Sequence, residues 1–93
     1  FKDFEDAATL ANSTDFGLTA AVHTASIHRA MEFAKRINAG IVQINGPTFG
    51  SEAHMPFGGT GASGNGSREP GTEALDVYSN LKNIAFNHLP GAV

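Results

Sequence analysis

The sequence has no cysteine among its 93 residues. A chain without thiols forms no disulfide, offers no thiolate to a metal ion and carries no cysteine nucleophile. Covalent catalysis through a thiolate is therefore excluded for these residues on their own.

Basic residues and long apolar runs are also scarce. The six Lys and Arg residues are scattered and the net charge is −3, so no basic stripe predicts nucleic-acid binding. No apolar run approaches the ~20 residues of a membrane span, and no charged segment followed by an apolar one predicts a signal peptide. We expect a cytoplasmic protein that binds neither nucleic acid nor membranes.

The four histidines do not have the spacing of a metal site. His23 and His28 fall on different predicted elements, and His54 and His88 stand alone. We expect surface or strand positions for them and no bound metal.

Length and composition predict at most one domain. Hydrophobic residues make up 41% and charged residues 16% of the chain, which is typical of a globular protein. A chain this short buries only about 60–65% of its unfolded surface, so its own core would be marginal. The sequence begins at Phe1 rather than at methionine, and we expect a segment of a longer protein.

The first half of the chain predicts a helix, a strand, a helix and a strand. Asp3 can cap a first helix whose apolar face holds Phe4, Ala7, Ala8 and Ala11. Turn formers follow, and then Leu18–His23 alternates as a strand does.

Thr24 or Ser26 can begin the second helix. Its apolar residues follow the i, i+3, i+4, i+7 pattern at Ile27, Ala30, Met31, Ala34 and Ile37. Gly40 stands where a left-handed C-cap is expected, and Ile41–Asn45 is the next strand.

A strand, a helix and a strand at this spacing predict a βαβ unit with parallel strands and a right-handed crossover. The fold class is therefore α/β. Parallel sheets are normally covered on both faces, so this unit predicts further strands beside it.

The second half changes character. The segment 46–71 holds three of the four prolines and shows neither a helical nor a strand period; we expect a rigid, functional loop. A short helix is predicted at 72–78, with Ala74, Leu75, Val77 and Tyr78 as buried candidates. A last strand at Leu81–His88 carries Ile84 and Phe86 on one face, and Leu89-Pro90-Gly91 ends it.

An ordered set of motifs resembles the aldehyde dehydrogenase superfamily. The motifs are Asn45-Gly46-Pro47-Thr48, Pro56-Phe57-Gly58-Gly59, Ser63-Gly64-Asn65-Gly66 and Arg68-Glu69-Pro70-Gly71, with Ala11-Asn12, Phe16 to Ala20 and Ala39-Gly40 upstream. The resemblance covers nearly the whole chain in the right order. Gly61 departs from the lysine that the family often has there, and Ser67 is an extra residue.

This resemblance implies the βαβ portion of a catalytic domain at residues 1–79. The Gly/Pro-rich loop and the short helix complete that portion, and an oligomerisation strand and tail follow at 80–93. In the family, a cysteine thiolate attacks an aldehyde, hydride passes to NAD or NADP, and an activated water releases the acid. We expect these 93 residues, which lack cysteine and bind no cofactor, to be inactive alone.

The resemblance also implies a substrate-binding role. The loop 46–54 would line the mouth of the aldehyde tunnel with Thr48, Phe49 and His54, and Phe57 would face the aldehyde. Apolar walls suit such a pocket because they exclude water. The motif wording is closest to branches that act on aromatic or bulky aldehydes. The strand Leu81–His88 would pair between subunits of a homo-oligomer.

Several other interpretations stay open at this stage. Gly59, Gly61 and Gly64 match a dinucleotide fingerprint formally, although no strand precedes and no helix follows them. Arg68 and Glu69 could form a salt bridge that steadies the turn, and Glu52 could meet a polar substrate group or solvent. A non-catalytic self-association module is the alternative to an enzyme segment.

Overall fold

The computed structural model describes residues 1–87 and residue 91 of the chain. The helices are α1 (Phe4–Ala11), α2 (Ile27–Arg36) and α3 (Ala74–Tyr78), and the strands are β1 (Phe16–Gly17), β2 (Thr19–Val22), β3 (Ile41–Ile44) and β4 (Thr60–Gly61). No helix among the described residues is long and apolar enough to cross a membrane. His88, Leu89 and Pro90, which were expected to end the last strand, lie outside the described residues.

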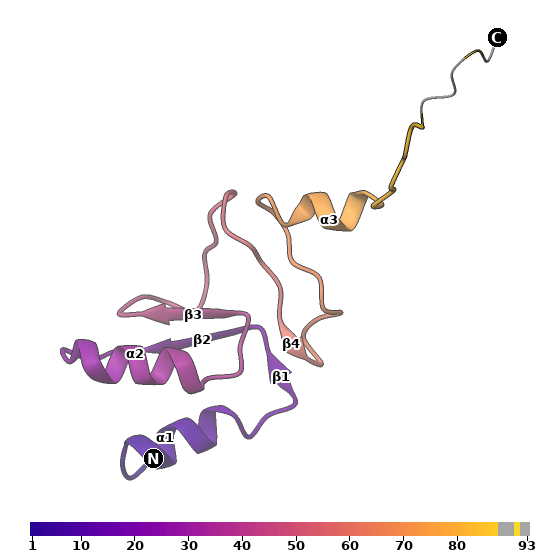
Figure 1. The fold of residues 1–93 in the computed structure, drawn as a ribbon. Coiled ribbons are helices and arrows are strands. Elements are labelled where there is room, and N and C mark those ends of the chain that lie inside the picture. Colours follow the sequence, from indigo (N-terminus) through magenta and orange to yellow (C-terminus); the bar gives the residue numbers. More distant parts are fainter. Residues whose placement is uncertain (88–90, 92–93) are drawn as a thin grey trace.

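The predicted parallel βαβ unit is confirmed. Strands β2 and β3 pair in parallel from Thr19 opposite Ile41 to Val22 opposite Ile44, and α2 connects them. In Figure 1 both α1 and α2 lie on the same side of this pair. The described residues pair no further strand with β2 or β3, so the expectation of neighbouring strands from elsewhere in a longer protein stays a prediction.

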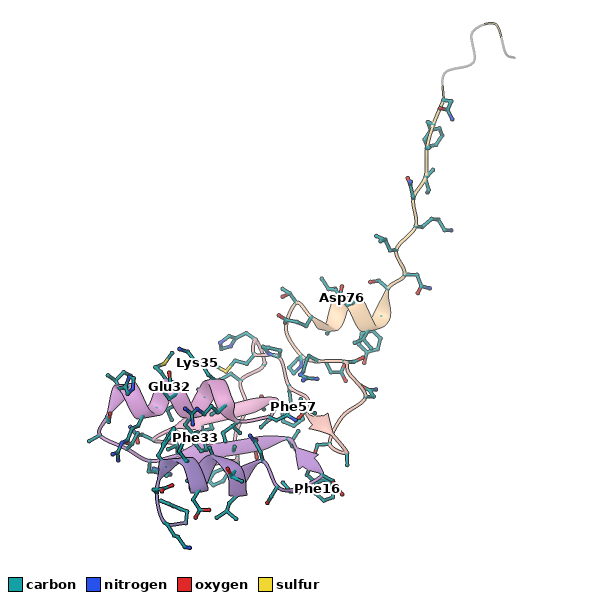
Figure 2. The ribbon with its side chains drawn as sticks, turned by 60° about the horizontal axis from the view of Figure 1, so that its bottom comes forward. Phe16, Glu32, Phe33, Lys35, Phe57 and Asp76 are labelled. Carbon is teal, nitrogen blue, oxygen red and sulfur yellow. The ribbon has the colours of Figure 1, made fainter. Side chains whose placement is uncertain are left out.

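The core lies between this sheet and the two helices. Ala8, Phe33 and Ile37 are buried, and Phe4, Val22 and Val42 pack around them. Phe33 lies between α2 and α1 in Figure 2. The cluster is small, because a sheet of two strands can cover only a narrow strip of helix surface.

The predicted buried face of α2 was partly wrong. Ala30 and Ile37 are buried as expected, but Ile27 is 75% and Met31 is 48% exposed. Phe33, which the apolar pattern had not included, is only 6% exposed. Ala30, Phe33 and Ile37 are spaced i, i+3, i+7, and this stripe faces the narrow sheet while its neighbours on the helix do not.

The structure confirms the predicted N-terminal caps of α1 and α2 but not the predicted C-cap of α2. Asp3 caps α1, since its side chain accepts a 2.8 Å hydrogen bond from the Asp6 backbone, and Ser26 rather than Thr24 caps α2. The expected C-cap at Gly40 was wrong, because α2 already gives way to extended backbone at Ile37. Gly40 serves a different purpose: a Cβ there would overlap the carbonyl oxygen of Gly58.

The segment 46–71 contains a pairing that its sequence did not reveal. β1 and β4 pair antiparallel, with Phe16 opposite Gly61 and Gly17 opposite Thr60. Strands of two residues show no alternation of apolar and polar positions, so periodicity cannot detect them. This pairing holds the loop against the N-terminal half of the chain (Figure 1).

The C-terminal part projects from the rest. The short helix is confirmed at α3, but its predicted burial was wrong: Leu75 is 68% and Tyr78 is 78% exposed. The predicted strand is absent over the described residues 81–87, which run away from the body of the chain. A strand forms only with a partner to receive its hydrogen bonds, and this chain offers none there.

Candidate functional site

The motif Pro56-Phe57-Gly58-Gly59 is a segment without a turn beside the start of the sheet, and its Phe57 forms an antiparallel bridge with Glu69. The backbone N–H of Phe57 donates to the Glu69 carbonyl, and the N–H of Glu69 donates to the Phe57 carbonyl, both at 2.9 Å. This pair of bonds joins the two glycine-rich motifs of the chain and fixes the backbone that carries Phe57.

Two hydroxyl groups, of Thr60 and Ser63, hold the residues that follow this motif by hydrogen bonds to backbone groups near the sheet. Thr60 Oγ1 donates to the Asn38 carbonyl at 3.0 Å, and Ser63 Oγ accepts from the Gly17 backbone N–H at 3.1 Å. Both partners lie at the end of the sheet where β2 and β3 begin. The residues directly after the Pro56-Phe57-Gly58-Gly59 motif are therefore joined to the βαβ region by hydrogen bonds.

Glycines let the backbones approach closely in this region. A Cβ on Gly59 would come within 2.6 Å of the Ser63 side chain, and one on Gly64 would overlap the carbonyl of Gly59. The strand–glycine–helix junction of a dinucleotide site is missing, because the next helix after Gly64 is α3 (Ala74–Tyr78).

Phe57 lines a hollow of about 510 Å³ beside the glycine-rich segment. Ser63, Asn65, Glu69 and Val77 contribute to the same hollow. Phe57 is 39% exposed, and Figure 2 places it beside β4, next to the segment that leads to α3. An aromatic wall beside a few polar groups is a common composition for a small-molecule site.

The other predicted substrate residues lie on the long loop between β3 and β4. Phe49 is 77% exposed, and Thr48 and His54 are also exposed. None of these three residues lines the hollow beside Phe57. His54 lies close to the segment before α3, since a Cβ on Gly71 would be 3.0 Å from the His54 carbonyl oxygen.

The expected salt bridge between Arg68 and Glu69 was wrong. Arg68 donates to the Ser67 carbonyl at 3.1 Å, whereas Glu69 Oε2 accepts from the Tyr78 hydroxyl at 2.9 Å. This bond from a neutral phenol to a carboxylate raises the pKa of Tyr78 above its usual value. Neighbouring side chains leave opposite sides of the paired backbone at 69, which explains why these two residues meet different partners.

The sequence motifs included Asn45 but did not predict its side-chain role. Asn45 has a φ of 56°. Its Oδ1 accepts from the Thr24 backbone N–H at 2.8 Å, and its Nδ2 donates to the Thr24 carbonyl at 3.0 Å. An Asn-Gly pair directly after a β-branched strand is a sequence signal for a left-handed residue, although it does not name the partner.

Comparisons with known proteins agree with these features. The model of the aldehyde dehydrogenase family matches residues 1–84. The benzaldehyde dehydrogenase (NAD(+)) of Pseudomonas putida is 38% identical over 90 residues, which are 97% of this chain and 18% of that protein.

Solved structures agree as well. HpcC from Thermus thermophilus superimposes with a TM-score of 0.84 at 41% identity, over 99% of this chain and 18% of that one. A salicylaldehyde dehydrogenase from Pseudomonas putida, complexed with salicylaldehyde, has a TM-score of 0.84 at 32% identity, over 97% of this chain and 19% of that one. This chain thus spans about a fifth of the length of these relatives, and it belongs to the aldehyde dehydrogenase family.

Proposed function

We propose that this chain is part of an enzyme that oxidises an aldehyde to a carboxylic acid with NAD or NADP. The observation that carries the proposal is the family match over residues 1–84, together with an NAD(+)-named relative that is similar over nearly the whole chain. The sequence has no cysteine, so the thiolate of the family's reaction comes from outside these residues. Cytoplasmic localisation stays a prediction.

The contribution of this chain is a wall of the substrate site. Phe57 lies in a segment that is tied to Glu69 by two backbone hydrogen bonds and to the sheet region through Thr60. A side chain on such a supported backbone keeps its position when a ligand binds, which lowers the entropic cost of binding. The loop 46–54, with Thr48, Phe49 and His54, forms the outer part of the same site.

The cofactor binds elsewhere in the enzyme. Gly59 and Gly64 pack against other parts of the chain, and no helix opens on them to receive a pyrophosphate. These features support a role of this chain in the aldehyde site and in subunit contacts rather than in cofactor binding.

Aromatic or bulky aldehydes are the proposed substrates. Two relatives are named for benzaldehyde and salicylaldehyde, and both are similar over nearly all of this chain. Phe49 and Phe57 can pack against an aromatic ring, which is worth about 0.5–1.5 kcal/mol beyond the area buried.

The test is an assay of NADH formation by the full-length enzyme with benzaldehyde and with acetaldehyde. We expect a higher kcat/KM for benzaldehyde, and no activity from the 93 residues alone. A full-length enzyme that oxidises neither aldehyde would overturn the proposed activity. A preference for acetaldehyde would overturn only the substrate class.

A second candidate is a self-association module without chemistry. It is favoured by the exposed apolar residues of the tail, where Leu81 and Phe86 are 105% and 95% exposed. Sedimentation of the 93-residue chain separates the two proposals: a stable, folded oligomer favours the module, and an aggregated or unfolded chain favours the enzyme segment.

A further inference from the structure

Asn45 stands at the junction between the sheet and the loop 46–56. Its backbone N–H continues the parallel ladder by donating to the Val22 carbonyl at 2.8 Å. Its side chain then bonds both backbone groups of Thr24, at 2.8 Å and 3.0 Å. One residue thus makes one hydrogen bond to the end of β2 and two to the segment that joins β2 to α2.

The backbone of Asn45 turns the chain at this point. Its φ of 56° is left-handed, a conformation that glycine adopts most easily and that asparagine tolerates better than most residues. Glycine could make the same turn but could not bond Thr24. The side-chain bonds therefore give asparagine a purpose here that backbone conformation alone does not explain.

Thr24 in turn belongs to a well-supported part of the fold. Its Oγ1 accepts from the backbone N–H of Ser26, the residue that caps α2. Helix α2 carries the buried Ala30 and Phe33. Asn45 therefore connects the beginning of the loop to an element that is packed in the core.

The loop itself has few tethers after this point. Its internal backbone bond runs from the Met55 N–H to the Glu52 carbonyl at 3.0 Å, close to its far end. Phe49 lies four positions after Asn45 and is 77% exposed. The direction in which the chain leaves Asn45 therefore has a large influence on where Phe49 lies.

We propose that Asn45 is a positioning residue for aldehyde selection: its bonds to Thr24 set the direction of the loop 46–56 and thereby the width of the substrate entrance. The inference rests on the proposed function. It adds to that function a residue that does not touch the substrate and acts through the placement of Thr48 and Phe49.

The experiment compares three variants of the full-length enzyme. Asn45→Gly keeps the left-handed backbone and removes both side-chain bonds, while Asn45→Asp keeps the acceptor and loses the donor. Asp3→Gly is the control, because it removes a single capping bond of α1 at the N-terminal end of the chain. The measurements are kcat and KM for benzaldehyde and acetaldehyde, and hydrogen exchange of residues 46–50.

We expect Asn45→Gly to raise KM for benzaldehyde about tenfold, the lower range for loss of one pocket contact. Its kcat for acetaldehyde should stay within about twofold of the parent, because a small substrate needs less of the wall. Exchange at 46–50 should become faster, and Asn45→Asp should fall between the parent and Asn45→Gly. Asp3→Gly should change neither the substrate ratio nor the exchange of the loop.

Equal losses for both aldehydes in Asn45→Gly, or unchanged exchange of the loop, would overturn the proposal and leave Asn45 a structural residue only. If Asn45→Gly does not fold, Asn45→Asp decides the question by the same two criteria. A parent enzyme that oxidises neither aldehyde would instead overturn the proposed function. Hydrogen exchange would then still decide whether Asn45 holds the loop.

Discussion

At the scale of single residues, the position of the segment that carries Phe57 depends on two glycines, Gly17 and Gly40, which have no side chain to obstruct it. A Cβ on Gly40 would overlap the Gly58 carbonyl, and one on Gly17 would overlap the Thr60 hydroxyl. The backbone N–H of Gly40 also donates to the Gly17 carbonyl at 2.9 Å. Gly17 and Gly40 therefore allow the segment 58–60 to lie directly against the beginning of the sheet.

We expect Gly40→Ala to destabilise the enzyme by about 1–3 kcal/mol, because the added methyl group displaces the backbone at Gly58. The measurement is the urea midpoint of the unfolding transition of the full-length enzyme. Gly46→Ala is the matched control, since a Cβ there would meet its nearest neighbour, Gln43, at an ordinary 3.5 Å. Equal midpoints for both variants would show that the close approach to Gly58 is not needed.

Tyr78 has a pH-dependent contact. Its hydroxyl donates to Glu69 at 2.9 Å, and this hydrogen bond raises its pKa above the ordinary value of about 10. The contact is fully present below the unfolded pKa and is lost as the pH rises through the higher folded pKa. We expect Glu69→Gln to return the pKa toward its ordinary value.

The measurement is the difference between the ultraviolet titrations of the full-length enzyme with and without Tyr78→Phe, made in the parent and in the Glu69→Gln background. A midpoint that is the same in the parent chain and in Glu69→Gln would mean that Glu69 does not hold the hydroxyl. Glu73→Gln serves as the control, because this neighbouring carboxylate accepts from Thr72 and not from Tyr78.

Phe49 is the residue that we propose to select aldehydes by size. We expect Phe49→Ala in the full-length enzyme to lower kcat/KM for benzaldehyde relative to acetaldehyde, by an amount that corresponds to about 1–3 kcal/mol per lost contact. An unchanged ratio would show that Phe49 does not reach the substrate. Phe1→Ala is the control, since Phe1 is an exposed aromatic residue at the other end of the described chain.

At the scale of elements, polar contacts add to the core packing between α1 and α2. Arg36 forms an ion pair with Glu5 at 2.6 Å and lies 5.3 Å above the ring of Phe4. The hydrogen bond and the charge of Glu5 raise the pKa of Arg36. This pair is exposed, so it contributes little to stability.

Asn12 makes another polar contact between these helices. Its Nδ2 donates to the Arg36 carbonyl and its Oδ1 accepts from the Asn38 backbone N–H, both at 2.8 Å. These bonds satisfy backbone groups at the end of α2, where the helix leaves its last carbonyls without partners. Asn12 therefore fixes how α2 passes into β3.

We expect Asn12→Ala to lower the stability of the enzyme by about 1–3 kcal/mol, as two hydrogen bonds of about 0.5–1.5 kcal/mol each are lost. Thermal unfolding of the full-length enzyme measures the change. Asn38→Ala removes an exposed amide side chain that makes no hydrogen bond among the described residues, and it should leave the transition unchanged. Equal shifts of the unfolding transition in the two variants would show that the contact between Asn12 and the end of α2 does not contribute to stability.

At the scale of the whole molecule, the chain is extended and leaves many of its apolar side chains exposed. Its dimensions are 78 × 25 × 22 Å, and the described tail contributes much of the length (Figure 1). Four hydrophobic residues are buried, whereas Leu81, Ile84 and Phe86 are largely exposed. Apolar side chains in such a row favour pairing with another protein surface.

We expect removal of residues 80–93 from the full-length enzyme to lower its oligomeric state, because the proposed subunit strand is lost. Sedimentation velocity measures this change. The substitution Phe86→Asp should act in the same direction, because it places a charge where an apolar contact is proposed. The same oligomer before and after the truncation would show that the tail does not join subunits.

Local pattern predicted the elements whose cause is local. Asp3 and Ser26 supply capping oxygens, and the β-branched run at Ile41–Ile44 is typical of a strand. The ordered glycine and proline motifs pointed to the family for the same reason, since each depends on a few consecutive residues. The resemblance singled out Phe57, which lines a hollow, and its contact with a substrate stays a prediction.

The rest depended on contacts between distant residues, which the sequence alone does not specify. Phe33 rather than Met31 is buried because the sheet is narrow and faces one stripe of α2. Gly40 meets Gly58, and Asn45 meets Thr24, only because the chain folds back on itself. The sequence by itself determined the βαβ order and the family; tertiary structure decided which side chains are buried, since burial depends on which surfaces meet.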